Sequence, residues 1–337
     1  MAKRVLGTKE LRAKEKSSKR RERRKQELKK IPPRELLSLL PKEMLESITE
    51  QTGVDVQVKH LFAPMLVYLF ILAILEDEDS SLQSLTDLYN SPQFSFFSGK
   101  GGHKTAKSSL SDRLASINCE FFKNLHAYYI EALQAKYGKA LKKKRHDITR
   151  FDSTMVSLCA ALTEIGMTVG AKPKKGEGMV QIKVSLGLNG FLPKTVKVFT
   201  DQAHLSEEKA LKEAIEFSKP ENDGAITFEI TDIYRRRWDI EVFFRFLKQY
   251  AGLRSLLSTK ENGITAVMYL RLIVGTMIWA YINVNDLKEY KRAKSEFKRA
   301  VQWEIDLLIG RMIGNRTLVE AKLYLLDFQG IIKNNTT

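Results

Sequence analysis

The spacing of hydrophobic positions changes twice along this chain. From residue 34 to residue 135, apolar side chains recur every three or four positions, as amphipathic helices require. From about residue 146 to residue 200, apolar and polar positions alternate instead, which is typical of half-buried strands. From residue 231 onward the helical spacing returns. We therefore predict an α+β protein in which helices precede and follow a sheet.

Turn residues divide the alternating region into short strands. The strands are predicted at 146–158, 179–188, 192–200 and 224–230. Gly, Pro and Asn separate the first three of them, so these three should form an antiparallel meander. A helix is predicted at about 205–218, where Ser206 can act as the N-cap and acidic residues fill the first turn.

Two long apolar runs raise the question of a membrane. Leu61–Leu75 is shorter than the roughly 20 residues that a helix needs to span a bilayer. Thr265–Ile282 is interrupted by Arg271. We therefore predict that both runs are helices packed inside the protein, and we expect no membrane partner.

A loop leads into a helix near residue 108. The helix is predicted to continue to Ala135, with Ser108, Ser109 or Ser111 as its cap. Because helix N-termini attract anions, Arg113 in the first turns is a candidate DNA contact. A capped helix inside a helical domain fits the pattern equally well.

The charge of the chain narrows the class of partner. Its 337 residues include 56 Lys and Arg against 40 Asp and Glu, for a net charge of +16. Such an excess disfavours an ordinary acidic metabolic enzyme and favours a polyanion, with nucleic acid ahead of an anionic membrane surface. Residues 1–30 alone hold 14 Lys and Arg and 4 Glu, so they are predicted to follow DNA phosphates, or to be a solvated helix in the free protein. A second basic cluster contains Lys142, Lys143 and Lys144.

These changes in composition and spacing predict four regions. They are a basic arm at 1–33, a helical DNA-binding domain at 34–145, a sheet domain at 146–260 and a helical C-terminal region at 261–337. The two cysteines, Cys119 and Cys159, are too few for a disulfide framework or a four-ligand zinc site. A reducing, cytoplasmic location is therefore the simple expectation.

The segment YRRRWDIEVFFRFLK at 234–248 concentrates chemistry on one face of a predicted helix. At about 100° per residue, Tyr234, Arg237, Glu241, Arg245 and Lys248 share one face, and most of the apolar residues occupy the other. An amphipathic helix with a solvated face and an Arg237–Glu241 pair has the same pattern. A core position is predicted for Trp238, with stacking on a DNA base as the alternative.

The spacing Tyr-x2-Arg-x3-Glu-x6-Lys, formed by Tyr234, Arg237, Glu241 and Lys248, resembles the signature of a group of bacterial insertion-sequence transposases of the DDE type. The strand sequence FDST, which contains Asp152, strengthens the resemblance, and the similar region covers roughly residues 35–285. The resemblance implies that 146–260 is a ribonuclease-H-like catalytic domain with a mixed sheet.

The resemblance also implies a metal-dependent site. Asp152, a second aspartate and Glu241 would hold two Mg²⁺ or Mn²⁺ ions, because hard cations prefer carboxylate oxygens and metal pairs catalyse phosphoryl displacement. Tyr234, Arg237 and Lys248 would contact phosphate near the cut. Further candidate DNA contacts are Arg245, Arg113, Lys142, Lys143 and Lys144.

The second aspartate departs from the family pattern. The relatives carry it in an Asp-Arg-Gly context, and this chain contains no such sequence. Only 32 residues separate Asp201 from Tyr234, as though an internal segment were missing. Asp201, Asp223 and Asp232 remain as stand-ins, of which Asp201 is the metal ligand predicted here.

Two functions follow from this resemblance. The first is an enzyme, a transposase that cleaves and transfers DNA strands at transposon ends during transposition and recombination. It would act on double-stranded DNA as a homodimer bridging two ends, in the bacterial cytoplasm at the nucleoid. The alternative is an inactive, transposase-derived protein that binds transposon ends and regulates transposition.

Overall fold

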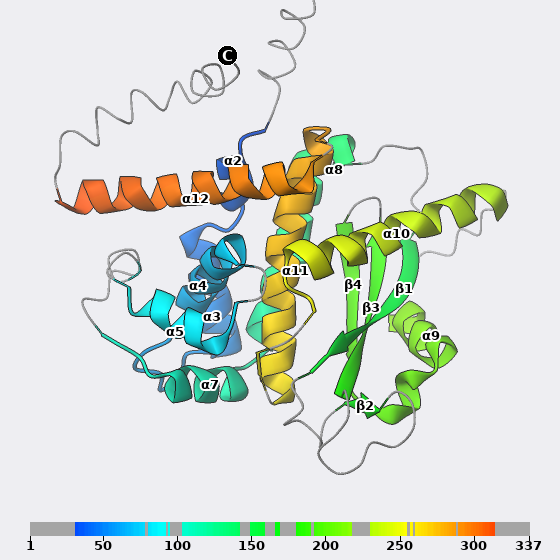
Figure 1. Ribbon diagram of the computed structural model, residues 1–337, viewed down its shortest axis with the longest axis horizontal. Coiled ribbons are helices and arrows are strands. Elements are labelled where there is room, and N and C mark those ends of the chain that lie inside the picture. Colours follow the sequence, from blue (N-terminus) through cyan, green and yellow to red (C-terminus); the bar gives the residue numbers. More distant parts are fainter. Residues whose placement is uncertain are drawn as a thin grey trace, which may run out of the picture. The chain divides into compact units, whose positions relative to one another are not determined.

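A computed structural model describes twelve parts of the chain (Figure 1). They are residues 31–77, 80–91, 94, 103–141, 149–158, 166–168, 180–189, 192–217, 230–254, 257–258, 260–287 and 289–313. Residues 33–305 form one compact unit, and residues 1–32 with 306–337 form a second. The basic arm up to residue 30, Lys142–Lys144 and residues 224–229 of a predicted strand lie outside the described residues.

The described elements confirm an α+β architecture. The helices are α2 (Pro33–Leu37), α3 (Lys42–Thr52), α4 (Ala63–Glu76), α5 (Leu82–Tyr89), α7 (Lys107–Ser116), α8 (Glu120–Leu141), the 3₁₀ helix η1 (Gln202–Leu205), α9 (Glu207–Phe217), α10 (Ile230–Tyr250), α11 (Glu261–Val284) and α12 (Tyr290–Ile313). The strands are β1 (Thr149–Ser157), β2 (Met167–Thr168), β3 (Val180–Asn189) and β4 (Leu192–Phe199).

The sheet is built around β3, which pairs with β1, β2 and β4. In its register, Asp152 of β1 lies opposite Leu186 of β3, and Leu186 lies opposite Val196 of β4. The predicted meander is therefore confirmed for these strands. The predicted mixed sheet is not confirmed, because every pair among the described strands is antiparallel. A two-residue connection such as the one between β3 and β4 joins antiparallel neighbours, whereas parallel ones need a long crossover.

The two faces of the sheet carry different helices. Helix α9 packs on β1, β3 and β4, whereas α10 packs on β1 and α8 on β4. Met155 and Phe199 point toward α9 and share a small apolar core with Ala210 of that helix. Since successive strand residues alternate between faces, the even-numbered positions of β1, Asp152 among them, point toward the side of α10.

Helix α11 runs through the middle of the compact unit. It packs on α4, α7, α8 and β4, and Figure 1 shows it between the N-terminal helices and the sheet. By length and composition it is the one described helix able to cross a membrane, with a mean hydropathy of 1.6 and 94% of its apolar window buried. This burial agrees with the prediction of a packed helix, and α4, the other apolar run, is buried in the same way.

The helix predicted from residue 108 to Ala135 is interrupted. Helix α7 ends at Ser116, Ile117 is extended and fully buried, and α8 begins at Glu120. Asn118 stabilises the break, because its side chain donates to the Thr52 carbonyl and accepts from the Glu120 N–H. The predicted serine cap was also wrong, since α7 begins after Ala106 without a side-chain cap.

Candidate active site

Strand β1 and helix α10 bring the two principal predicted residues onto contacting elements. Asp152 lies on β1 and is 9% exposed, and Glu241 lies on α10 and is half-buried. An ion pair joins the two elements, with Arg150 Nη1 at 2.6 Å from Asp239 Oδ2. Because Arg150 and Asp152 are two residues apart, they share the face of β1 that α10 covers.

The inner face of α10 is apolar and explains how the helix is held. Phe243 and Phe246 are buried and pack against Trp279 of α11, at ring-centroid distances of 5.3 and 5.1 Å. Gly275 of α11 lies directly against Leu247, where any larger residue would collide. The opposite face of α10 is left to polar residues.

The polar face of α10 carries a positive group in a desolvated position. Lys248 is half-buried, and burial, together with the neighbouring Arg254 guanidinium, lowers the pKa of its ammonium group. Tyr234 and Arg237 lie on the first half of the same helix, where the side chains are outside the described part of the chain. The spacing of the predicted Tyr-Arg-Glu-Lys signature is therefore carried by one continuous helix.

Trp238 corrects a prediction. It is 57% exposed rather than part of the core. Arg245 lies over its ring, with the guanidinium carbon 5.4 Å from the centroid. The inner face of α10 is already filled by phenylalanines, and Trp238 belongs to the arc that also carries Glu241 and Arg245.

Asp201 does not lie near Asp152. In the sheet register, Val196 of β4 is level with Asp152 of β1. Asp201 comes five residues after Val196, beyond the end of β4. Five strand residues correspond to about 17 Å, and two strand spacings add about 10 Å across the sheet. A metal pair with ions about 4 Å apart cannot join two such distant carboxylates.

Asp201 instead belongs to a polar cluster at the α9 side of the sheet. Its carboxylate caps η1 through the Ala203 N–H and pairs with His204 Nδ1 at 2.7 Å. His204 Nε2 contacts Glu213 at 2.5 Å, and Glu213 also pairs with Lys197. Desolvation opposes ionisation of Asp201, but the contacts with His204 outweigh it and lower its pKa. The hydrogen bonds from Lys197 and then His204 lower the pKa of Glu213.

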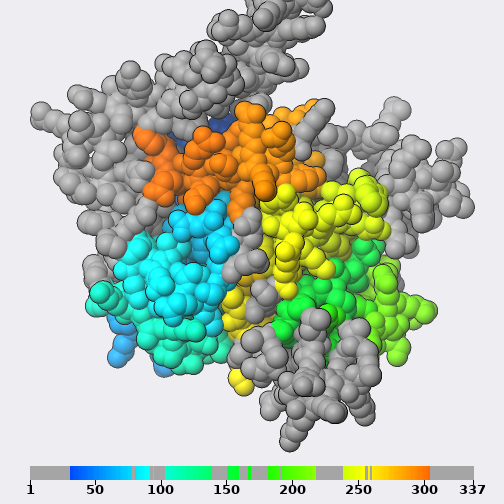
Figure 2. Space-filling model, viewed as in Figure 1, coloured from blue at the N-terminus to red at the C-terminus, as the bar shows by residue number. Residues whose placement is uncertain are grey.

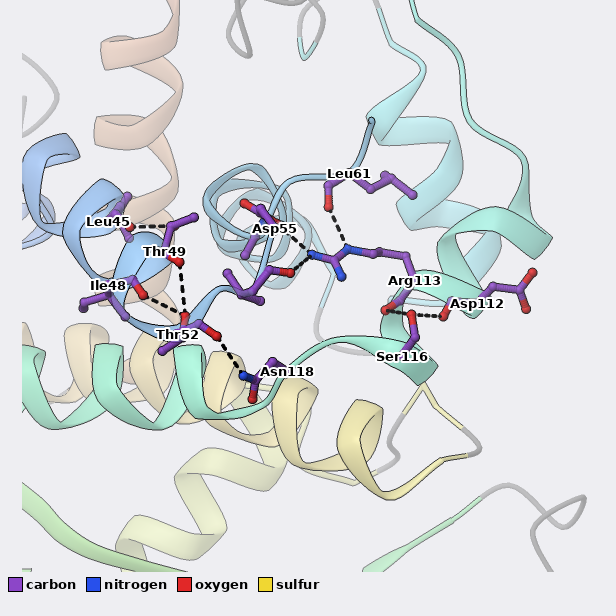
Figure 3. Close-up of polar contacts among 12 residues, drawn as sticks. Leu45, Ile48, Thr49, Thr52, Asp55, Leu61, Asp112, Arg113, Ser116 and Asn118 are labelled. Carbon is purple, nitrogen blue, oxygen red and sulfur yellow. Dashed lines mark hydrogen bonds and ion pairs between the residues drawn. The ribbon is translucent and has the colours of Figure 1, made fainter. Parts of the chain in front are cut away.

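Arg113 has a structural place inside the helical layer (Figure 3). Its guanidinium is 2.7 Å from Asp55 and also donates to the carbonyl oxygens of Val54 and Leu61. The Arg113 and Asp55 side chains are only 11% and 9% exposed. These contacts hold the loop between α3 and α4 against α7, and they occupy donors that a phosphate contact would need.

Carboxylates suit Mg²⁺ or Mn²⁺, and two of the predicted ligands lie on contacting elements. Within the described ranges, however, no group of three or more His, Cys, Asp and Glu residues could hold a metal ion. Of the other stand-ins for the second aspartate, Asp223 lies outside the described residues, and Asp232 lies in the first turn of α10 with its side chain outside them. Asp152 and Glu241 therefore suit a divalent ion by their ligand chemistry.

The Arg150–Asp239 ion pair was not predicted from the sequence. A strand residue two positions before Asp152 shares its face, so the alternation marks Arg150 as a neighbour of the site. The partner is 89 residues away on another element. Only the packing of α10 on β1 identifies it.

The comparisons with known proteins find similarity to transposases over the part of the chain that contains β1 and α10. Residues 120–277 match the family described as transposase DDE domain, a region that contains the whole of β1 and of α10. The predicted resemblance to DDE-type transposases is confirmed in this form, as similarity over part of the chain. No solved structure matches the chain.

Two curated relatives carry names of insertion-sequence transposases. One, from Geobacillus stearothermophilus, is named "Probable transposase for insertion sequence element IS5377" and is 38% identical over 53 residues. The other, from Synechocystis sp., is named "Putative transposase for insertion sequence element IS4SA" and is 32% identical over 78 residues. These matches cover 15% and 23% of this chain and only 14% and 22% of the relatives.

Proposed function

We propose that this protein is a DDE-type transposase of the insertion-sequence kind, with a ribonuclease-H-like catalytic region. It would cleave DNA at transposon ends and transfer the freed strands to target DNA. The observation that carries the proposal is the packing of α10, with Glu241, on the face of β1 that presents Asp152. The similarity of residues 120–277 to the transposase DDE domain supports it.

The Arg150–Asp239 ion pair indicates how these carboxylates are arranged. Asp239 and Glu241 are about 200° apart around the helix, so they lie on opposite flanks of α10. Arg150 and Asp152 are about 7 Å apart along β1. Figure 1 shows α10 lying across the strands, and the proposal requires that the flank of α10 opposite the Arg150–Asp239 ion pair, which carries Glu241, faces Asp152.

Asp152 and Glu241 would hold divalent ions, with Mg²⁺ or Mn²⁺ as the cofactor. Bound in a pair, such ions stabilise the attacking and leaving oxygens of a phosphoryl displacement. The third carboxylate would come from Asp223 or Asp232, since the sheet register separates Asp201 from Asp152. Tyr234, Arg237 and Lys248 would hold the phosphate next to the cut, and Arg is suited to a bidentate contact.

The partners follow from the same proposal. The substrate is double-stranded DNA, both as transposon end and as target, and two copies of the chain would bridge two ends. The basic arm, Lys142–Lys144 and Arg245 would add phosphate contacts. Such a protein would act in the bacterial cytoplasm at the nucleoid.

The test is strand cleavage by the full chain on a duplex that carries the ends of its element. Glu241→Gln and Asp152→Asn should each abolish Mg²⁺-dependent cleavage and leave duplex binding intact, since only the metal ligands are lost. Glu208→Gln, at an exposed position on α9, is the matched control and should cleave like the wild type. Cleavage that survives either site variant would refute the catalytic assignment.

One observation favours the second function, a transposase-derived protein that binds transposon ends without cutting them. The chain contains no Asp-Arg-Gly sequence, the context in which the resemblance places the second aspartate. Wild-type protein that binds the ends with metal present but leaves every strand intact would identify this function.

A further inference from the structure

Helix α12 presents a basic face that none of the predicted DNA contacts includes. Its inner side is apolar, with Ala293, Phe297 and Ala300 buried in the described structure. The exposed charged positions in its first three turns are all basic. They are Lys291, Arg292, Lys298 and Arg299.

Basic residues outnumber acidic ones along this part of the helix, although the exposed Glu289 directly precedes it. Glu296 is the single acid between Tyr290 and Val301. It is occupied by the Tyr281 hydroxyl and by Arg292, whose Nε lies 3.1 Å from Glu296 Oε1. Helix α9 shows the contrasting pattern of a solvated helix, because its two lysines stand among four glutamates.

The first turn of α12 packs on the C-terminal end of α10, the helix that carries Glu241 and Lys248. Tyr290, in its first turn, packs against Phe246 and Tyr250 of α10 at centroid distances of 5.5 and 5.7 Å. Figure 2 shows the described parts of α10, in yellow, and α12, in orange, meeting on one side of the molecule.

Helical spacing arranges the cations in two rows. Lys291 and Lys298 are seven residues apart, as are Arg292 and Arg299, so each row spans about 10.5 Å along the axis. That length is about three base-pair steps of duplex DNA, whose phosphates advance about 3.4 Å per strand. The two cations of a row on a rigid helix can therefore meet phosphates about three steps apart without a change of fold.

We propose that the outer face of α12 binds the phosphate backbone of duplex DNA and extends the basic side of α10. Lys291, Lys298 and Arg299 supply the contacts, while Arg292 is shared with Glu296. The inference rests on the proposed function, because DNA held at the polar face of α10 is what continues onto α12. A helix that contacts only phosphates contributes equally to every DNA sequence.

The test uses the full chain and compares two triple variants with equal loss of charge. The first is Lys291→Gln, Lys298→Gln, Arg299→Gln. The matched control, Lys194→Gln, Lys209→Gln, Lys212→Gln, removes exposed lysines from β4 and α9. Binding to a duplex of arbitrary sequence is measured by fluorescence anisotropy over a range of salt concentrations, and thermal unfolding verifies that both variants fold.

The α12 variant should bind at least tenfold more weakly than the control at moderate salt. Its plot of log affinity against log salt should be shallower by about 2.7, since each phosphate contact contributes about 0.9. An α12 variant with the duplex affinity and salt slope of the control would overturn the inference. So would an α12 variant that loses binding to anionic lipid vesicles and keeps its affinity for duplex DNA. Wild-type protein that binds no duplex at all would instead refute the proposed function.

Discussion

His126 predicts how the stability of this fold depends on pH. The side chain lies on α8, is 3% exposed, and meets the edge of the Tyr269 ring on α11 at a centroid distance of 5.5 Å. Its Nε2 has no hydrogen-bond partner among the described residues. Burial lowers the pKa of His126 from 6.5 to about 4, because the charged imidazolium would lose its hydration.

The sign of the effect follows from proton binding. Between pH 6.5 and about pH 4 the unfolded chain protonates His126, whereas the folded protein keeps it neutral. The free energy of unfolding is therefore unaffected by protonation of His126 above pH 6.5 and decreases as the pH falls toward 4. A pKa difference of this size corresponds to a loss of about 3 kcal/mol in the free energy of unfolding.

Urea unfolding at a series of pH values measures this loss. His126→Leu removes the titrating group and the unpartnered nitrogen together, and His126→Gln keeps a polar side chain that does not titrate. The difference in unfolding free energy between wild type and either variant should change by about 3 kcal/mol from neutral pH to pH 4. A control variant, His60→Gln, removes an exposed histidine from the loop before α4. If the His126 variants lose stability on acidification as steeply as the wild type, the burial explanation is refuted.

Two further predictions concern the packing and the polar cluster. Gly275→Ala would push a methyl group into Leu247 and should lower the free energy of unfolding, measured in urea, by about 1–3 kcal/mol. The same substitution should lower it less when Leu247 is also replaced by alanine, because the smaller side chain leaves room for the methyl group. An equal cost in both backgrounds would contradict the close helix approach. Lys197→Met removes the leading cause of the lowered pKa of Glu213. In the wild type, the ionised Glu213 carboxylate stabilises the fold fully above its ordinary pKa of 4.5, and this stabilisation is lost as the pH falls through the lowered pKa. The variant should therefore lose less stability than the wild type on acidification below pH 4.5, and an unchanged acid profile would contradict the pairing.

Local patterns predicted the elements of this fold well. Alternation marked the strands that became β1, β3 and β4, and the apolar run at Thr265–Ile282 marked a buried helix. The break at Ile117 was not predictable in this way, because the apolar spacing continues through it. A buried isoleucine and an asparagine that reaches the Thr52 carbonyl interrupt the helix, and that carbonyl is 66 residues away.

The candidate site shows the same limit. Asp152 on a strand and Glu241 on a helix were expected from their local sequence, but the contact between β1 and α10 depends on the whole sheet. Position on a helix likewise could not decide whether Trp238 is covered, since that depends on which neighbours pack there. Arg113 looked like an exposed cation because its partner, Asp55, lies 58 residues earlier.

The central position of α11 has a consequence for how the chain is made. A ribosome releases the N-terminal helices and the sheet before it releases residues 261–284, yet α4, α7, α8 and β4 all pack on that segment. Until it emerges, their apolar faces have no native cover, and exposed surfaces of this kind favour aggregation or chaperone binding. The compact unit therefore completes its folding late in synthesis, and a nascent chain stalled at residue 260 should be sensitive to protease where the full chain is resistant.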